Sequence, residues 1–339
     1  MPLTFRLLCA GALLLLAGVT GCVDDPPPLS PDAGTTPIDP YPPIVDRTSC
    51  SGLTLGTGTY TFVLRHQDRD RTYRIHVPPT YVATKPTPVV VAFHGFSSDE
   101  LEQEGLSRMS QVADEEGFIA IYPRGVNYPE ALRTASDGGY DDTRSWNAGG
   151  CCGPAQIYGV NDVDFIEALF ADLDKRVCVD TRRTYATGLS NGAFFSYRLA
   201  CERAARFAAI APVAGSENVI PCTPTRPVAV MHFHGTADTT IPYDGGTIPL
   251  GRPYPSAPDT VARWIERNGC TGPLLETYRV GDSSCSTQSG CTSPVTLCTI
   301  QNGGHTWPGG LMPPEYGYTT KDLDATRQMW RFFETHPRP

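Results

Sequence analysis

The hydrophobic pattern of this chain changes character along its length. In the two runs Tyr60–Leu64 and Thr72–Val77, apolar positions alternate with polar ones on either side of a polar turn. Alternation with a period of two is typical of strands that bury one face. These runs therefore predict an N-terminal antiparallel hairpin.

Six later apolar runs lack strict alternation. Short runs of this kind are typical of strands that are buried on both faces of a parallel sheet. They are Pro88–His94, Phe118–Pro123, Thr184–Gly188, Phe207–Gly215, Val228–Gly235 and Pro294–Ile300.

Helix-like segments separate these runs. Because strand and helix alternate, the sequence predicts an α/β fold with a doubly wound, mostly parallel sheet. Active sites in such sheets lie at the carboxyl ends of the strands, so candidate chemistry is expected there. The helical segments are Asp99–Glu116, Asp162–Lys175, Ala193–Ala205, Pro258–Asn268 and Asp322–Thr335.

The N-terminal region has a different composition. Arg6, the apolar run Leu7–Val19 and the small residues before Cys22 predict an export signal over residues 1–21. The apolar run is too short to span a membrane. Residues 19–22 resemble the lipobox of bacterial lipoproteins, which predicts lipidation of Cys22; an ordinary signal cleaved nearby is the alternative.

A proline-rich segment follows the signal. Residues 22–49 have too few apolar side chains to form a core, so we expect a disordered, extended tether. The remaining residues, 50–339, are expected to form one catalytic domain. The protein is therefore expected to be exported, and either lipid-anchored to the cell envelope or secreted.

The cysteine content agrees with export. Of 12 cysteines, Cys9 leaves with the signal and Cys22 takes the lipid, which leaves ten, an even number that allows five disulfides. The connectivity cannot be deduced from spacing alone. We predict the pairs Cys285–Cys291 and Cys201–Cys222, and we expect the adjacent Cys151 and Cys152 to bond to different partners.

The charge of the chain excludes some partners. The formal net charge is −9, and Lys and Arg form no cluster that could meet a phosphate backbone. We therefore expect no nucleic-acid partner, and a neutral or weakly charged substrate.

The sequence Gly188-Leu-Ser190-Asn-Gly192 stands between a predicted strand and a predicted helix. This strand–turn–helix setting is typical of a nucleophile elbow, in which a sharp turn exposes the central serine. Glycine at both ends of the motif leaves room for that turn. Ser190 is therefore the candidate nucleophile; a small residue in a tight turn is the alternative.

A serine nucleophile needs a base, and the base needs a carboxylate that orients it. Besides the strand residues His232 and His234, only His305 and His336 follow Ser190. His336 ends the last predicted helix, whereas His305 lies in a glycine-rich loop after the last predicted strand. Among the aspartates between Ser190 and His305, only Asp238 lies close to a strand end. The predicted triad is Ser190, Asp238 and His305.

Hydrolysis of an ester also needs N–H donors for the oxyanion. We expect one donor to be the backbone N–H of Asn191 and the other to come from the loop after the strand Pro88–His94. Phe96 is our choice for the second donor, and Gly95 is the alternative.

Three histidines offer a competing interpretation. His232 and His234 share one face of a strand and could bind a metal together with His94. No carboxylate-rich loop accompanies them, so hydrogen-bonded side chains at the edge of the sheet are the expected role, and no metal site is predicted.

With these residues in place, the sequence resembles the secreted polyhydroxybutyrate depolymerase and feruloyl esterase group of α/β-hydrolases, related to carbohydrate esterase family one. The resemblance rests on segments such as ATGLSNGAFFSYRLAC, SWNAGGCCG, HFHGTAD and GGHTWPGG. It implies an α/β-hydrolase fold and a cofactor-free serine esterase with the triad named above. Some feruloyl esterases of the group have bridging cysteines where this chain has Leu189 and Thr306.

The expected substrate is a carboxylic ester of the plant cell wall, either a feruloyl ester or acetylated xylan. Trp307 and Trp146 are expected to stack on the substrate, with aromatic packing under loops as the alternative. A poly(3-hydroxybutyrate) or other hydroxyalkanoate depolymerase is the second hypothesis. An inactive binding protein with the same fold is a third.

Overall fold

A computed structural model describes residues 41, 43–53, 55–127, 143–248 and 252–339. The expected signal peptide, the lipidation site Cys22 and most of the expected tether lie outside these residues. No helix in the described part of the chain is long and apolar enough to cross a membrane.

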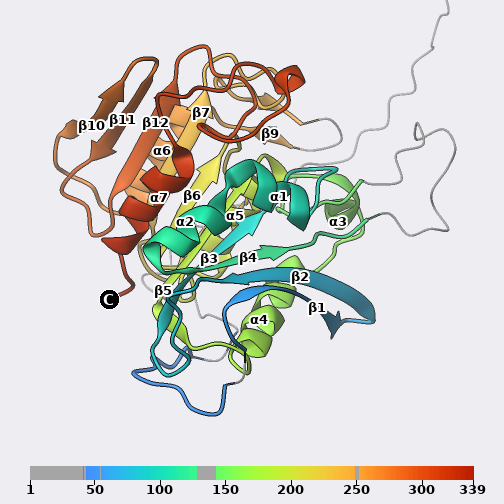
Figure 1. Ribbon diagram of the computed structural model, residues 1–339. Helices are drawn as coiled ribbons and strands as arrows, with labels where there is room; N and C mark the ends of the chain where they lie inside the picture. Colours follow the sequence, from blue (N-terminus) through green and yellow to red (C-terminus); the bar gives the residue numbers. More distant parts are fainter. Residues whose placement is uncertain (1–40, 42, 54, 128–142, 249–251) are drawn as a thin grey trace, which may run out of the picture. The chain divides into compact units, whose positions relative to one another are not determined.

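A ten-stranded sheet forms the centre of the fold, with its strands in the order β1-β2-β4-β3-β5-β6-β7-β12-β11-β10 (Figure 1). The central strands from β4 to β12 are parallel, and an antiparallel hairpin flanks them on each side. The parallel strands are β3 (Thr87–Phe93), β4 (Ile119–Pro123), β5 (Val179–Leu189), β6 (Ala209–Val213), β7 (Ala229–Gly235) and β12 (Val295–Ile300).

Helices cover both faces of this sheet. On one face pack α4 (Asp162–Leu173), α5 (Asn191–Glu202) and α6 (Ala257–Arg267). On the other pack α1 (Glu100–Ser107), α2 (Met109–Glu116) and α7 (Ala325–Glu334). The central strands are buried on both sides because each face meets helices, which explains why their apolar runs do not alternate.

These observations confirm the predicted α/β fold and the N-terminal hairpin, formed by β1 (Gly58–His66) and β2 (Arg69–Val77). One expected helix, Asp99–Glu116, is instead two, α1 and α2. They are separated by Arg108, whose φ of 54° places it in the left-handed region.

A second hairpin was not predicted. Strands β10 (Leu274–Val280) and β11 (Ser283–Gln288) extend the sheet beyond β12. Strand β10 lies at the edge and is mostly exposed, so it has no buried face to impose an alternating pattern. The shorter elements are α3 (Gly153–Ile157), β8 (Gly246–Thr247), β9 (Pro253–Tyr254) and the 3-10 helix η3 (Pro314–Tyr316).

The described part of the chain contains five disulfides, and they use all ten cysteines other than Cys9 and Cys22. Such a number fits an exported protein. Cys201 is bonded to Cys222, as expected, and the other pairs are Cys50–Cys178, Cys151–Cys152, Cys270–Cys291 and Cys285–Cys298.

Two expectations about the cysteines are wrong. Cys285 does not bond to Cys291, because strands β11 and β12 place Cys298 directly opposite Cys285 in register. Cys151 and Cys152 bond to each other rather than to different partners.

The folded domain begins before residue 50, although the sequence assigns residues 22–49 to a disordered tether. Asp46 accepts a hydrogen bond from Thr181 Oγ1 at 3.0 Å and pairs with Arg338. Arg47 forms a 3.1 Å ion pair with Asp174 of the α4 C-terminus. These contacts attach the end of the expected tether to the domain.

Candidate active site

Ser190 lies in the turn between β5 and α5, as the elbow motif predicts. Its φ of 56° and ψ of −119° put a non-glycine residue in an unfavourable backbone conformation. The surrounding structure must hold the serine there, because strain of this kind costs about 1–3 kcal/mol.

The two glycines of the motif allow the turn to sit close to β3. A Cβ atom on Gly192 would lie 2.2 Å from the carbonyl oxygen of Phe93, and one on Gly188 would lie 2.6 Å from the same atom. No side chain fits at either position without moving backbone.

His305 and Asp238 meet at the carboxyl end of the sheet. Nδ1 of His305 lies 2.7 Å from Oδ2 of Asp238, and both residues are buried. The carboxylate can only accept, so Nδ1–H donates to it and Nε2 keeps its lone pair. The other oxygen, Oδ1, accepts the backbone N–H groups of Thr240 at 2.9 Å and Ile241 at 2.8 Å, which fixes the carboxylate.

A cavity of about 430 Å³ brings Ser190 and His305 together, since both line it. Asp238 lies behind His305 and is not among the lining residues. The cavity has both polar and apolar lining residues. Its apolar lining comes from Phe96, Leu106, Leu189, Met312 and Tyr316.

The expected oxyanion donors flank Ser190. Asn191 is the first residue of α5, so its backbone N–H has no acceptor within the helix. Phe96 and the alternative Gly95 both lie in the loop after β3 and line the same cavity as Ser190.

The structure contradicts the expected stacking of Trp146 and Trp307 on substrate. Both side chains are fully buried. Trp146 stacks on Phe195 of α5 in the core, and Trp307 donates its indole N–H to Thr326 of α7 at 3.0 Å. Among the described residues, the tyrosine and phenylalanine side chains that line the cavity are Phe96, 45% exposed, and Tyr316, 41% exposed.

The three histidines of the metal hypothesis all have hydrogen-bonding partners. His94 Nδ1 donates to the Gly95 carbonyl at 2.7 Å, and its Nε2 accepts from the Gly125 N–H at 2.8 Å. Burial lowers the pKa of His94 to about 4, so the ring is neutral near pH 7.

The other two, His232 and His234 of β7, belong to a buried chain of hydrogen bonds. His234 Nε2 lies 2.7 Å from the Ile241 carbonyl and must donate to it; therefore Nδ1 accepts from His232 Nε2 at 3.0 Å. His232 Nδ1 then accepts from the Tyr197 hydroxyl at 2.8 Å. Burial lowers the pKa of both histidines, which keeps them neutral and the direction of the chain fixed.

This series of hydrogen bonds ends beside the candidate triad. No sequence motif predicted that His234 would contact the triad. His234 holds the carbonyl of Ile241, whose N–H in turn binds Asp238, and His234 Nε2 is itself 3.6 Å from Asp238 Oδ2. The spacing of four residues between His234 and Asp238 is the only sequence signal of this contact.

A family model described as Esterase PHB depolymerase matches residues 71–240, which is half of the chain. The chain belongs to the Esterase PHB depolymerase family. The matched region contains Ser190 and Asp238 and ends before His305. Membership confirms the predicted group and the predicted class, a carboxylic-ester hydrolase.

Individual relatives agree with the family. The chain is 28% identical over 249 residues to "Feruloyl esterase B" of Piromyces equi; the match covers 70% of this chain and 43% of that protein. It is 29% identical over 314 residues to "Putative esterase NocK" of Nocardia uniformis subsp. tsuyamanensis, with 85% and 83% covered. This chain thus spans less than half of the first relative and most of the second.

Solved structures show the same fold. The acetyl xylan esterase from Aspergillus awamori superposes with a TM-score of 0.55 at 15% sequence identity, over 80% of this chain and 98% of that one. This likeness confirms the α/β-hydrolase architecture.

Proposed function

We propose that the protein is a serine esterase in which Ser190 is the nucleophile, His305 the base and Asp238 the residue that orients the base. The observation that carries this proposal is the 2.7 Å contact between His305 Nδ1 and Asp238 Oδ2, with His305 lining the same cavity as Ser190. The strained backbone at Ser190 adds support, because strain of this kind gathers at functional positions.

In the proposed mechanism, Ser190 Oγ attacks the ester carbonyl while His305 Nε2 takes its proton. His305 then protonates the leaving alcohol, and a water molecule hydrolyses the acyl-enzyme by the reverse sequence of proton transfers. Asp238 remains ionised and stabilises the imidazolium that forms in each step. The backbone N–H groups of Asn191 and Phe96 bind the oxyanion, and losing such a donor typically slows turnover ~100- to 1,000-fold.

A fluorophosphonate probe tests the nucleophile. We expect the wild-type protein to be labelled and Ser190→Ala to be unlabelled and unable to hydrolyse esters. Ser98→Ala is the matched control, because Ser98 lines the same cavity outside the elbow. Labelling that persists in Ser190→Ala, or no labelling of the wild type, would favour the alternative of an inactive protein with this fold.

We further propose that the substrate is a neutral ester of the plant cell wall, a feruloyl ester or acetylated xylan. The named relatives support this choice, since one is called a feruloyl esterase and a protein of similar fold is called an acetyl xylan esterase. Phe96 and Tyr316, which line the cavity and are partly exposed, offer a surface for an aromatic acyl group.

Cleavage of poly(3-hydroxybutyrate) is the second candidate, and the description of the family favours it. Assays of methyl ferulate, acetylated xylan and hydroxybutyrate oligomers with the same enzyme preparation distinguish the two proposed substrate classes. Cleavage of the oligomers alone would contradict the cell-wall proposal.

We also propose that the protein is tethered to the cell envelope by a lipid on Cys22. The lipobox-like residues before Cys22 support this, and the five disulfides fit export. The test is whether Cys22→Ser moves the protein from the membrane fraction to the soluble fraction; unchanged membrane association would contradict the anchor.

A further inference from the structure

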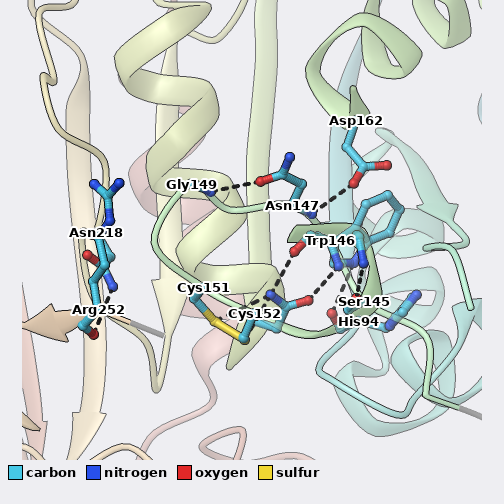
Figure 2. The surroundings of a disulfide bond; sticks show 12 residues. His94, Ser145, Trp146, Asn147, Gly149, Cys151, Cys152, Asp162, Asn218 and Arg252 are labelled. Atoms are coloured by element: carbon cyan, nitrogen blue, oxygen red, sulfur yellow. Dashed lines mark hydrogen bonds between the residues drawn. A yellow bond between two sulfur atoms is a disulfide. The ribbon is translucent and has the colours of Figure 1, made fainter. Parts of the chain in front are cut away.

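A single loop, residues 144–153, lies between the two segments that carry the proposed oxyanion donors. We call it the brace loop. Figure 2 shows its Trp146 and Asn147 together with the bonded Cys151 and Cys152. The loop ends at Gly153, the first residue of α3, and it contacts both the end of β3 and the start of α5.

The first set of contacts holds the β3 side. The indole N–H of Trp146 donates to the carbonyl of His94 at 3.1 Å, and the N–H of Ser97 donates to the carbonyl of Arg144 at 2.9 Å. These bonds lie on both sides of Phe96 in the chain. A Cβ atom on Gly153 would come within 2.5 Å of the Phe96 ring, so the loop also packs directly against that ring.

The second set of contacts holds the side chain of Asn191. Its Oδ1 accepts the backbone N–H of Trp146 at 2.6 Å, and its Nδ2 donates to the carbonyl of Trp146 at 3.0 Å. The side-chain amide therefore both accepts from and donates to the backbone of Trp146, as a neighbouring strand would. Asn191 is 1% exposed, so breaking these bonds leaves buried polar groups unpaired.

The disulfide occupies the remaining donor of that amide. Asn191 Nδ2 lies 3.5 Å from Cys151 Sγ and 3.3 Å from Cys152 Sγ, so the bonded sulfurs accept its second hydrogen. The bond between adjacent residues keeps both sulfurs at one point of the loop. A hydrogen bond from the Ala148 N–H to the Cys151 carbonyl at 2.7 Å closes the turn that presents them.

The rest of the brace loop is fixed to the domain. The backbone N–H of Asn147 donates to Asp162 Oδ2 at 2.8 Å, and Asp162 also receives the buried guanidinium of Arg71. On the other side, the Gly150 N–H donates to the carbonyl of Asn218 at 2.9 Å. The loop is therefore anchored on two separate parts of the fold.

We propose that the side chain of Asn191 is a positioning residue for the oxyanion hole, and that Trp146 and the Cys151–Cys152 disulfide hold it in place. This inference rests on the proposed function, in which the Asn191 N–H binds the oxyanion. The side chain touches no substrate. The anchored side chain fixes the direction of the Asn191 backbone N–H. Because the brace loop also holds the segment around Phe96, this one loop sets the spacing of the two donors.

The variant Asn191→Ala tests the proposal because it keeps the backbone N–H and removes its anchor. We expect kcat on an oxygen ester to fall ~10- to 100-fold with KM nearly unchanged, since small displacements of this kind have such effects. The matching thionoester is the decisive comparison. A thiocarbonyl sulfur accepts hydrogen bonds poorly, so the ratio of the oxygen-ester rate to the thionoester rate reports the donors and should fall as well.

The double variant Cys151→Ala with Cys152→Ala tests the disulfide, and we expect the same ratio to fall by a smaller factor. Cys201→Ala with Cys222→Ala is the matched control. It removes a disulfide from the far end of α5, and we expect it to lower stability and leave the ratio unchanged.

Three results would overturn the proposal or its premise. An unchanged ratio in Asn191→Ala, whether the two rates stay at their wild-type values or fall equally, would show that the side chain does not position the oxyanion hole. An unchanged ratio in the Cys151 and Cys152 double variant would remove the disulfide from the proposal. Hydrolysis that survives Ser190→Ala would instead contradict the proposed function.

Discussion

The carboxylate of Asp238 contacts His305 through one oxygen and the backbone of its own loop through the other. Oδ2 lies 2.7 Å from His305 Nδ1, while Oδ1 accepts two backbone N–H groups. An asparagine can reproduce the second set of bonds with its oxygen. Its amide nitrogen must then face His305 Nδ1, which forces the histidine into the wrong tautomer.

We therefore predict that Asp238→Asn folds normally and loses activity, with kcat lower by about 10⁴-fold, as in other enzymes with this triad. Steady-state kinetics on a soluble ester gives the measurement. Asp244→Asn, an exposed aspartate in the same loop, should retain full activity. A loss of less than tenfold in Asp238→Asn would show that Asp238 does not orient the base.

Tyr316 is expected to contribute to the binding of aromatic acyl groups. Its ring centroid lies 6.4 Å from that of His305, and the side chain is exposed in the cavity. Its backbone carbonyl accepts the His305 N–H at 2.8 Å, a bond that alanine preserves. We predict that Tyr316→Ala raises KM for methyl ferulate about three- to tenfold, in keeping with an aromatic contact of ~0.5–1.5 kcal/mol, and changes KM for an acetate ester little.

The control for this substitution is Tyr318→Ala, which changes an exposed tyrosine outside the described cavity lining. It should leave KM for both esters unchanged. Equal effects of Tyr316→Ala on the ferulate and acetate esters would contradict selective aromatic binding.

Gly192 is predicted to be intolerant of any side chain. The added Cβ of alanine would meet the Phe93 carbonyl oxygen at 2.2 Å, and backbone at this point has no room to move. We expect Gly192→Ala to lower the free energy of unfolding by more than ~2 kcal/mol, measured by urea denaturation. Gly105→Ala is the contrasting change: it lies within helix α1 with nothing near its Cβ position, and should be neutral or stabilising by up to ~1 kcal/mol.

The parts of the site that lie directly after strands could be predicted from the sequence. Ser190, Asp238 and His305 each follow a buried strand, and parallel strands bring their carboxyl ends to one edge of the sheet. Apolar runs and turn residues are local signals, so these positions could be found without knowledge of the tertiary structure.

Features that depend on contacts between distant segments could not be found this way. Trp307 is two residues from His305 and yet points into the core against α7, because neighbouring residues in a loop can face opposite ways. The bond between Cys151 and Cys152 has no signature that separates it from pairing with other partners. The anchoring of Asn191 by Trp146 joins residues 45 positions apart.

The last prediction concerns the effect of pH on stability through His232. Burial holds the pKa of His232 well below its ordinary value, and the neighbouring His234 lowers it further. In the unfolded chain the pKa returns to about 6.5, so the unfolded state binds a proton that the folded state excludes. The contribution of His232 to stability is therefore fully present above about pH 6.5 and falls with decreasing pH until the pKa of the folded state is reached.

We predict that His232→Gln weakens this dependence. Glutamine does not titrate, and its Nε2 can still donate to His234 in place of the histidine nitrogen. Between about pH 7 and pH 5 the free energy of unfolding of the variant should fall by up to ~2 kcal/mol less than that of the wild type, because each pH unit is worth ~1.4 kcal/mol per excluded proton. Urea denaturation at each pH gives the measurement. At about pH 8, His232 is neutral in both the folded and the unfolded state, so the difference in the free energy of unfolding there gives the effect of the substitution apart from titration. Parallel pH profiles for the two proteins would mean that His232 takes up its proton without unfolding.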